Sequence, residues 1–171
     1  MRKLLLLPLV PAVAGALAWA HWPEPALPGP VTADRVLVDK SEHRLVLLRG
    51  GSVLKGYRVS FGADPVGHKQ REGDERTPEG LYRIDRRNAR SAFHRSLHVS
   101  YPDRRDVERA RELGVAPGGD IMIHGIRNGL GWAGRLHRLA DWTDGCIAVT
   151  NREMDELWRA VPDGTPIEVR P

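Results

Sequence analysis

The residue best suited to covalent chemistry is Cys146, the single cysteine of this 171-residue chain. Gly145 precedes it, and a glycine lets the backbone turn sharply and leaves the neighbouring sulfur accessible. A lone thiol on a turn between ordered elements is a usual presentation of a nucleophile. The competing interpretation of a single cysteine is a buried structural side chain. A catalytic interpretation therefore needs a base and supporting groups elsewhere in the chain.

A thiol nucleophile needs a base within hydrogen-bond reach, and histidine is the commonest base. Of the seven histidines, His124 stands apart because it ends the apolar run 120–124 and is followed by Gly125. A histidine at a strand end is held rigidly and faces an open edge, although without a partner it is interpreted as a core histidine. His43 lies in a hairpin connection and His68 in a polar loop, so both are expected to be solvated.

A metal site is a different class of interpretation. The candidate ligands are Cys146 and four histidines, His94, His98, His124 and His137. The spacing of His94 and His98 suits two ligands on one helical turn, but their segment is predicted to be a strand. The chain also lacks a His-Glu-x-x-His motif. No metal and no other cofactor is therefore expected.

Short β-strands are expected to position these residues. Runs rich in β-forming residues and bounded by turn residues occupy 35–39, 44–49, 52–60, 81–85, 96–100, 120–124 and 165–169. Two helices are also expected, one over 103–113 capped by Asp103, and one in which Thr150 and Glu153 have capping-box spacing. The pattern predicts a mainly β domain, a β-sandwich or open barrel with one or two flanking helices.

Residues 1–20 differ from the rest of the chain. Arg2 and Lys3 precede an apolar stretch that ends in small residues, which is the pattern of a secretory signal peptide. The alternative is an uncleaved membrane anchor, because the apolar stretch is close to the shortest length that spans a bilayer. Residues 21–34 are proline-rich and are expected to form an extended linker. The domain is expected to occupy 35–171 and to face outward.

Export affects how the single cysteine, Cys146, is interpreted. Exported domains use cysteines in pairs, so an unpaired thiol is either deeply buried or functional. The formal net charge is +4 and the arginines are scattered, which does not favour nucleic acid as a partner. Contact with a membrane is expected only through residues 1–20, if they are not removed.

Several sequence features occur together around the candidate nucleophile and base. They are a His-Gly pair at a strand end, a glycine-rich stretch after it, Thr143-x-Gly145-Cys146, an Asn five residues after the cysteine, and the upstream segment Thr77-Pro78-Glu79-Gly80-Leu81-Tyr82. Together and in this order they resemble the L,D-transpeptidase catalytic domain family (YkuD/ErfK-like) over about 36–169. The resemblance implies a bacterial enzyme of the periplasm or cell envelope that acts on peptidoglycan stem peptides in cell-wall biogenesis or remodelling.

The resemblance also implies roles for individual residues. Cys146 would attack the amide after the third stem residue, release the terminal D-amino acid and form a thioester that an acceptor amine resolves. His124 matches the family's base, and the carbonyl of Gly125 takes the place of the group that orients the imidazole. Support of the nucleophile and of the oxyanion falls to the turn formed by Thr143, Asp144 and Gly145.

Two positions depart from the family's pattern. Asp144 stands where the family usually has histidine, and Ala148 where it usually has arginine. A carboxylate at 144 raises the pKa of the thiol if it is close and unpaired, or stabilises a protonated His124 if it is hydrogen-bonded to it. Loss of the arginine removes a cation that can meet a substrate carboxylate. The candidate replacements are Arg127, Arg135 and Arg138.

Two other functions remain open on the same scaffold. If water resolves the thioester, the domain is a hydrolase, either an L,D-carboxypeptidase or an amidase-type enzyme. The departures at Asp144 and Ala148 also allow a non-catalytic wall-binding module, although the retention of both His124 and Cys146 argues against it.

Overall fold

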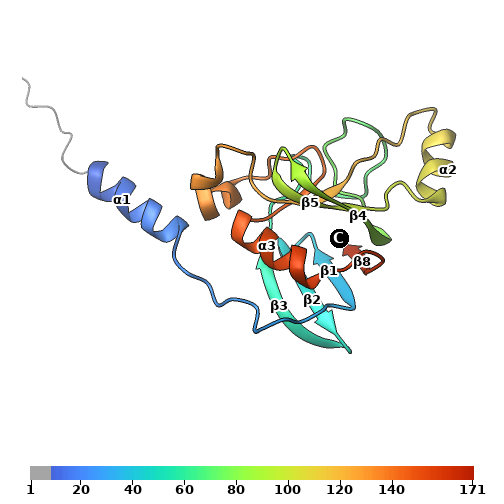
Figure 1. Ribbon diagram of the computed structural model, residues 1–171. Coiled ribbons are helices and arrows are strands. Elements are labelled where there is room, and N and C mark those ends of the chain that lie inside the picture. Colours follow the sequence, from blue (N-terminus) through green and yellow to red (C-terminus); the bar gives the residue numbers. More distant parts are fainter. Residues whose placement is uncertain (1–8) are drawn as a thin grey trace, which may run out of the picture.

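The computed structural model describes residues 9–171. Eight strands form one mixed sheet in the order β3-β2-β1-β8-β4-β5-β6-β7 (Figure 1). The strands are β1 (Arg35–Asp39), β2 (Arg44–Arg49), β3 (Ser52–Arg58), β4 (Gly80–Ser91), β5 (His94–Val99), β6 (Met122–His124), β7 (Ile147–Ala148) and β8 (Pro166–Arg170). The helices are α1 (Leu9–Ala20), α2 (Arg104–Glu112), α3 (Asn151–Ala160) and the 3-10 segment η1 (Gly131–Leu139). The prediction of a mainly β domain with flanking helices is confirmed.

Neighbouring strands are antiparallel except for two parallel pairs, β1 with β8 and β6 with β7. The chain that follows β3 then reaches the far edge of the sheet. Ser60 bridges Ala148 of β7, and Gly62 bridges Thr143 just before it. The two-residue strand β7 is therefore held on both sides, by β6 and by this segment.

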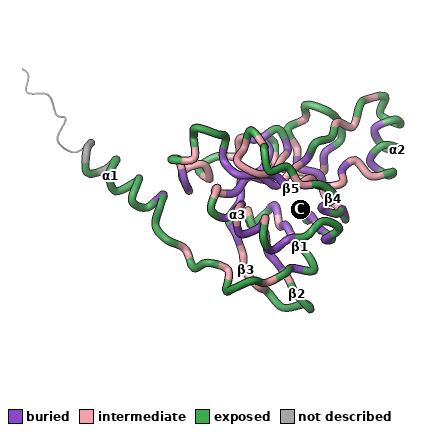
Figure 2. Tube along the Cα trace, viewed as in Figure 1, coloured by how far each residue is buried: buried purple, intermediate pink, exposed green. Residues whose placement is uncertain are grey.

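The hydrophobic core lies between one face of the sheet and α3 (Figure 2). Ile84, Leu97 and Ile123 on the sheet face and Leu157 on α3 are all fully buried. Burying a large aliphatic side chain contributes about 1.5–3 kcal/mol, so packing contributes most of the stability of a helix as short as α3. The opposite face of the same strands is left for the residues of the candidate site.

Both capped helices follow the sequence prediction closely. In α2 the side chain of Asp103 caps the helix and Asp106 completes the capping box. In α3 Thr150 and Glu153 form the same arrangement. Each box satisfies amides that the first turn of a helix leaves without partners, so a local sequence signal is sufficient to fix both helix starts.

The hairpin of β4 and β5 is longer than predicted. The expected strands were 81–85 and 96–100, whereas the pairing continues to Ser91 and His94 at the tip. Irregular register near Arg86 and again near the tip bends the hairpin. The extension carries mostly exposed polar side chains without apolar alternation, and it is stabilised by backbone pairing that leaves no local sequence signal.

Residues 21–34 form no helix or strand, as expected, but they are docked on the domain. The carbonyl of Glu24 accepts a hydrogen bond from Arg152 at 3.1 Å. The amide of Ala33 donates to the carbonyl of Ala160 at 2.8 Å, and Leu27 packs against the core. The linker is therefore part of the folded domain.

His68 is not solvated as predicted, since only 17% of its side chain is exposed, whereas His43 keeps 38% of its side chain exposed but also contacts a distant residue. His43 Nε2 lies 2.9 Å from a carboxylate oxygen of Asp141. The amide of Glu79 donates to His68 Nδ1 at 3.0 Å, and His68 Nε2 lies 3.1 Å from a carboxylate oxygen of Asp106. Both rings join loops to distant elements, which local sequence does not reveal.

The predicted signal peptide or membrane anchor covers residues 1–20. Of these, residues 1–8 lie outside the described part of the chain. α1 covers 9–20, and its exposed residues include Val13 and Trp19 (Figure 2). Between residues 9 and 171, no helix combines the length and the apolar character needed to cross a membrane.

Candidate active site

The register of β6 and β7 brings the candidate nucleophile and base to one face of the sheet. Ile123 pairs with Ile147 and His124 with Ala148, and both isoleucines are fully buried in the core. Because side chains alternate along a strand, His124 and Cys146 point away from the core on neighbouring strands. They are diagonal neighbours, about 8 Å apart at Cα from the strand spacing and the rise per residue. A cysteine and a histidine side chain can span that separation.

The orientation of His124 is fixed by its own neighbour. Nδ1 lies 2.6 Å from the carbonyl oxygen of Gly125, and since a carbonyl only accepts, Nδ1 carries the hydrogen. Nε2 then holds the lone pair that can receive a proton. Burial lowers the pKa of His124, and the hydrogen bond to Gly125 opposes this shift in part. The imidazole is therefore neutral at pH 7 and suited to act as a base.

Aromatic rings enclose the imidazole. The ring of Phe93 lies 4.6 Å from that of His124 between centroids, and Trp142 meets it edge-on at 5.8 Å. The indole nitrogen of Trp142 in turn donates to His137 Nδ1 at 3.4 Å. Burial, together with the charge of Arg138, lowers the pKa of His137 to about 4, so His137 remains a neutral acceptor that holds Trp142. These rings shield His124 from water.

Asn151 binds the backbone that follows His124. Its side-chain oxygen accepts a hydrogen bond from the amide of Ile126 at 2.8 Å. A Cβ atom at position 125 would lie 2.7 Å from the same oxygen, so only glycine allows this approach. The histidine-glycine pair and the asparagine after the cysteine therefore form one packing unit, although they are far apart in sequence.

The turn before the nucleophile depends on Thr143 and Gly145. The hydroxyl of Thr143 donates to the carbonyl of Cys146 at 2.8 Å and accepts from the amide of Gly145 at 3.2 Å. Gly145 has φ of 117°, and a Cβ atom there would lie 2.5 Å from the carbonyl oxygen of Arg76. Both the backbone angle and the close contact require glycine. The role of this turn in binding an oxyanion stays a prediction.

The thiol of Cys146 is half-buried and protonated at rest. Sγ donates to the carbonyl of Asp120 at 3.6 Å. Burial raises the pKa of Cys146 to about 11; a hydrogen bond from the backbone of Met122 opposes the shift, and the charges of Asp144 and Asp120 add to it. Thiol and imidazole are thus both neutral at pH 7.

Asp144 is exposed, and its carboxylate accepts no hydrogen bond from the described residues, 9–171. Of the two alternatives for this departure from the family's pattern, the geometry favours the close and unpaired carboxylate. Its charge raises the pKa of Cys146 without touching His124 through a hydrogen bond.

Asp144→Asn is expected to lower the pKa of Cys146 because it removes a negative charge that disfavours the thiolate. Alkylation by iodoacetamide, followed against pH, should show a midpoint below that of the native protein. At pH 8.5 the rate should rise about twofold to tenfold, the size expected for one exposed charge. The control is Asp163→Asn, an exposed carboxylate paired with Arg87. An unchanged midpoint in Asp144→Asn would leave Asp144 with no influence on the thiol.

Two of the three arginines predicted to meet substrate are directed elsewhere. Arg135 Nε lies 2.9 Å from a carboxylate oxygen of Glu24 in the linker. Arg138 pairs with Glu153 of α3 at 2.5 Å and lies 3.7 Å from Glu24. These four side chains line a cavity of about 250 Å³ beside the linker. Arg135 and Arg138 thus have partners in the linker and in α3, and their role as substrate cations stays a prediction, as does that of the exposed Arg127.

Three residues near the site were not identified from the sequence. Trp142 lies next to Thr143, so its place in the motif was a usable signal. Phe93 is in the tip of the β4–β5 hairpin and Asp120 precedes β6, and only strand pairing brings them to the site. Among residues 9–171, no group of three or more His, Cys, Asp or Glu side chains is arranged to hold a metal ion.

The fold and the site define a sheet-based domain that presents a cysteine beside a buried, neutral histidine. The L,D-transpeptidase catalytic domain family, YkuD, matches residues 33–169, and the chain belongs to this family. Its catalytic residues and activity are taken up as a proposal below.

One curated relative is distant in sequence. YafK of Escherichia coli K12, a protein named as an L,D-transpeptidase, is 27% identical over 111 residues, which cover 64% of this chain and 37% of YafK. The chain thus spans little more than a third of the length of this curated relative.

Solved structures share the fold. The helical cell shape determining protein Pgp2 from Campylobacter jejuni matches with a TM-score of 0.61 and 23% identity, over 92% of this chain and 54% of Pgp2. Bd1075 of Bdellovibrio bacteriovorus matches with a TM-score of 0.56 and 23% identity, over 82% of this chain and 48% of Bd1075.

Proposed function

We propose that the domain is an exported bacterial L,D-transpeptidase that acts on peptidoglycan stem peptides through a Cys146 thioester, in cell-wall biogenesis or remodelling. The observation that carries the proposal is the placement of Cys146 and His124 as diagonal neighbours on one sheet face, with Nδ1 of His124 bonded to Gly125 and Nε2 left as the proton acceptor. Membership of the family supports the substrate class. The name of Pgp2, a cell shape determining protein, supports a role in the wall.

The first half-reaction follows from the two neutral groups. His124 Nε2 removes the thiol proton while Sγ attacks the carbonyl carbon of the amide, and an oxyanion forms. When the oxyanion collapses, the C–N bond breaks and the leaving amine takes the proton from the imidazolium. The products are a free D-amino acid and a thioester on Cys146. Because burial raises the pKa of the thiol to about 11, the attack depends on a base that removes this proton, and His124 supplies it.

The second half-reaction resolves the thioester. An acceptor amine gives a proton to His124 as its nitrogen attacks, and the thiol is restored when the C–S bond breaks and the proton returns to sulfur. Water in place of the amine gives hydrolysis by the same steps. The domain then acts as an L,D-carboxypeptidase or an amidase-type hydrolase.

The test is incubation of the full-length protein with a purified stem tetrapeptide, followed by the intact mass of the protein. We expect the mass to rise by that of a tripeptide acyl group, on Cys146, with release of one D-amino acid. Cross-linked dimers or exchange of the terminal amino acid then identify transfer, whereas tripeptide monomers identify hydrolysis. If no adduct and no product form under any condition that preserves the fold, the domain is a non-catalytic wall-binding module.

Export is part of the proposal. Fractionation of cells that produce the full chain should place it in the periplasm or cell envelope. Recovery only from the cytoplasm would contradict this part.

A further inference from the structure

One row of side chains crosses the outer face of the sheet and ends at the nucleophile. Arg86 of β4 pairs with His98 of β5, and His98 pairs with Met122 of β6. Continuing the register of β6 and β7 by one residue places Cys146 beside Met122. Paired residues on neighbouring strands project to the same face. Arg86, His98 and the thiol therefore lie on one face of the sheet.

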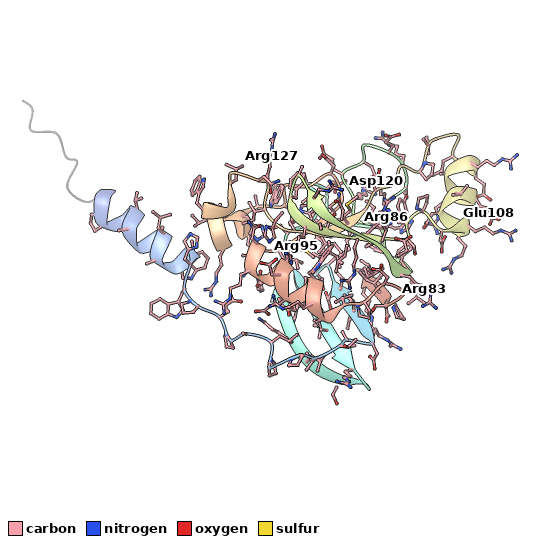
Figure 3. All side chains as sticks on the ribbon, viewed as in Figure 1. Arg83, Arg86, Arg95, Glu108, Asp120 and Arg127 are labelled. Atoms are coloured by element: carbon pink, nitrogen blue, oxygen red, sulfur yellow. The ribbon has the colours of Figure 1, made fainter. Side chains whose placement is uncertain are left out.

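Asp120 joins this row to the thiol. Its carbonyl accepts the thiol hydrogen bond of Cys146 at 3.6 Å. Its carboxylate accepts a hydrogen bond from Arg86 Nη2 at 3.3 Å and lies 3.9 Å from His98 Nε2. The side chains of Arg86 and Asp120 are 62% and 81% exposed. In Figure 3 the two are labelled next to each other.

The exposed pair is easily opened. An ion pair on the surface contributes little free energy, since water solvates both charges when they separate. A ligand carboxylate can take two hydrogen bonds from a guanidinium, which is a stronger arrangement than the single contact between Arg86 and Asp120. Asp120, once released, is free to bind an ammonium group. The pair is thus suited to a ligand that carries both charges close together.

The surroundings favour a ligand of this kind over a simple anion. Asp85 lies 2.6 Å from His98 at the base of the row, and Asp144 is exposed on the turn before Cys146. A ligand carrying only negative charge would meet Arg86 but also these carboxylates. A ligand with a cation and an anion meets a partner for each.

We propose that Arg86 and Asp120 bind the end of the donor peptide's third residue when that side chain ends in an α-amino acid group, as diaminopimelate does. Arg86 binds the carboxylate and Asp120 binds the ammonium, so the scissile carbonyl of the same residue is set beside Cys146. This inference rests on the proposed function. It replaces Arg135 and Arg138 by Arg86 as the cation that selects the substrate.

The test compares two stem tetrapeptides that differ only in the third residue, meso-diaminopimelate or L-lysine. Lysine keeps an ammonium but lacks the side-chain carboxylate. With the native protein, kcat/KM for acylation should be about tenfold to a hundredfold higher for the diaminopimelate peptide, the range expected for one charged contact. The difference should appear mainly in KM.

Arg86→Gln should lower kcat/KM for the diaminopimelate peptide to about that for the lysine peptide, and so remove this preference. The matched control is Arg83→Gln, an exposed arginine of the same strand that donates to the carbonyl of Gly164. It should keep the full preference. Equal melting temperatures of the two variants exclude a folding defect.

The outcomes separate the inference from the function on which it rests. Equal acylation of the native protein by both peptides, or a preference that survives Arg86→Gln, overturns the inference and leaves the transpeptidase proposal standing. Acylation by neither peptide overturns the proposed function, and the inference with it.

Discussion

Cys146→Ser is expected to abolish acylation and turnover, with a loss of about 10⁴-fold or more, as for removal of other catalytic nucleophiles. A serine hydroxyl is much less acidic than a thiol, and the single neutral imidazole of His124 is a weak base for it. The turn should keep its shape because Thr143 contacts the backbone carbonyl at position 146 and not the sulfur. Intact mass after incubation with tetrapeptide gives the measurement, and the adduct should be absent.

The serine hydroxyl in Cys146→Ser could itself act as a weak nucleophile, so a second variant without it is needed. Cys146→Ala should be equally inactive, and both variants should melt at the temperature of the native protein. Turnover at the native rate in either variant would show that Cys146 is not the nucleophile.

His124→Ala is expected to lower the rate of acylation by about 10²–10⁴-fold, the usual range for loss of a general base. The pH dependence gives a further signature. Burial lowers the pKa of His124, so the native rate should rise with pH through a midpoint below 6.5 as the imidazole loses its proton, and then level off. This rise of the rate with pH should be absent in His124→Ala.

Chemical rescue separates the loss of a base from a loss of structure. The alanine variant leaves a space between Phe93 and Trp142 that matches an imidazole ring, so added imidazole should restore part of the activity. His21→Ala in the linker should react at the native rate. His137→Ala should have the smaller effect of a group that holds Trp142, and a larger loss there than at His124 would show that His137 is the base.

Local signals predicted the starts of α2 and α3 and the end of β6. Both helix starts are set by capping boxes whose residues lie three positions apart, as at Thr150 and Glu153. β6 ends at His124, as its apolar run indicated. These features depend on neighbours in sequence, and a single chain therefore contains the information needed to place them.

The remaining parts of the site depend on pairings between distant segments. Arg86 reaches the row of Cys146 through β5 and β6, and no pattern around position 86 shows this. Arg135 is one of three candidate replacements for the arginine that the family usually has at the position of Ala148. In the structure the linker carboxylate of Glu24 holds it, a contact between residues more than a hundred positions apart.

The docked linker limits how far the active site can move from α1. A free chain with the length of residues 21–34 would have its ends about 20 Å apart on average and would allow the domain to point in any direction. Here Leu27 and Ala33 pack against the domain, and Glu24 is held by Arg135. The chain leaves the domain at a fixed point beside η1, which fixes the position of Cys146 relative to α1. Adding flexible residues within the docked segment would break contacts before it extended the reach of the active site.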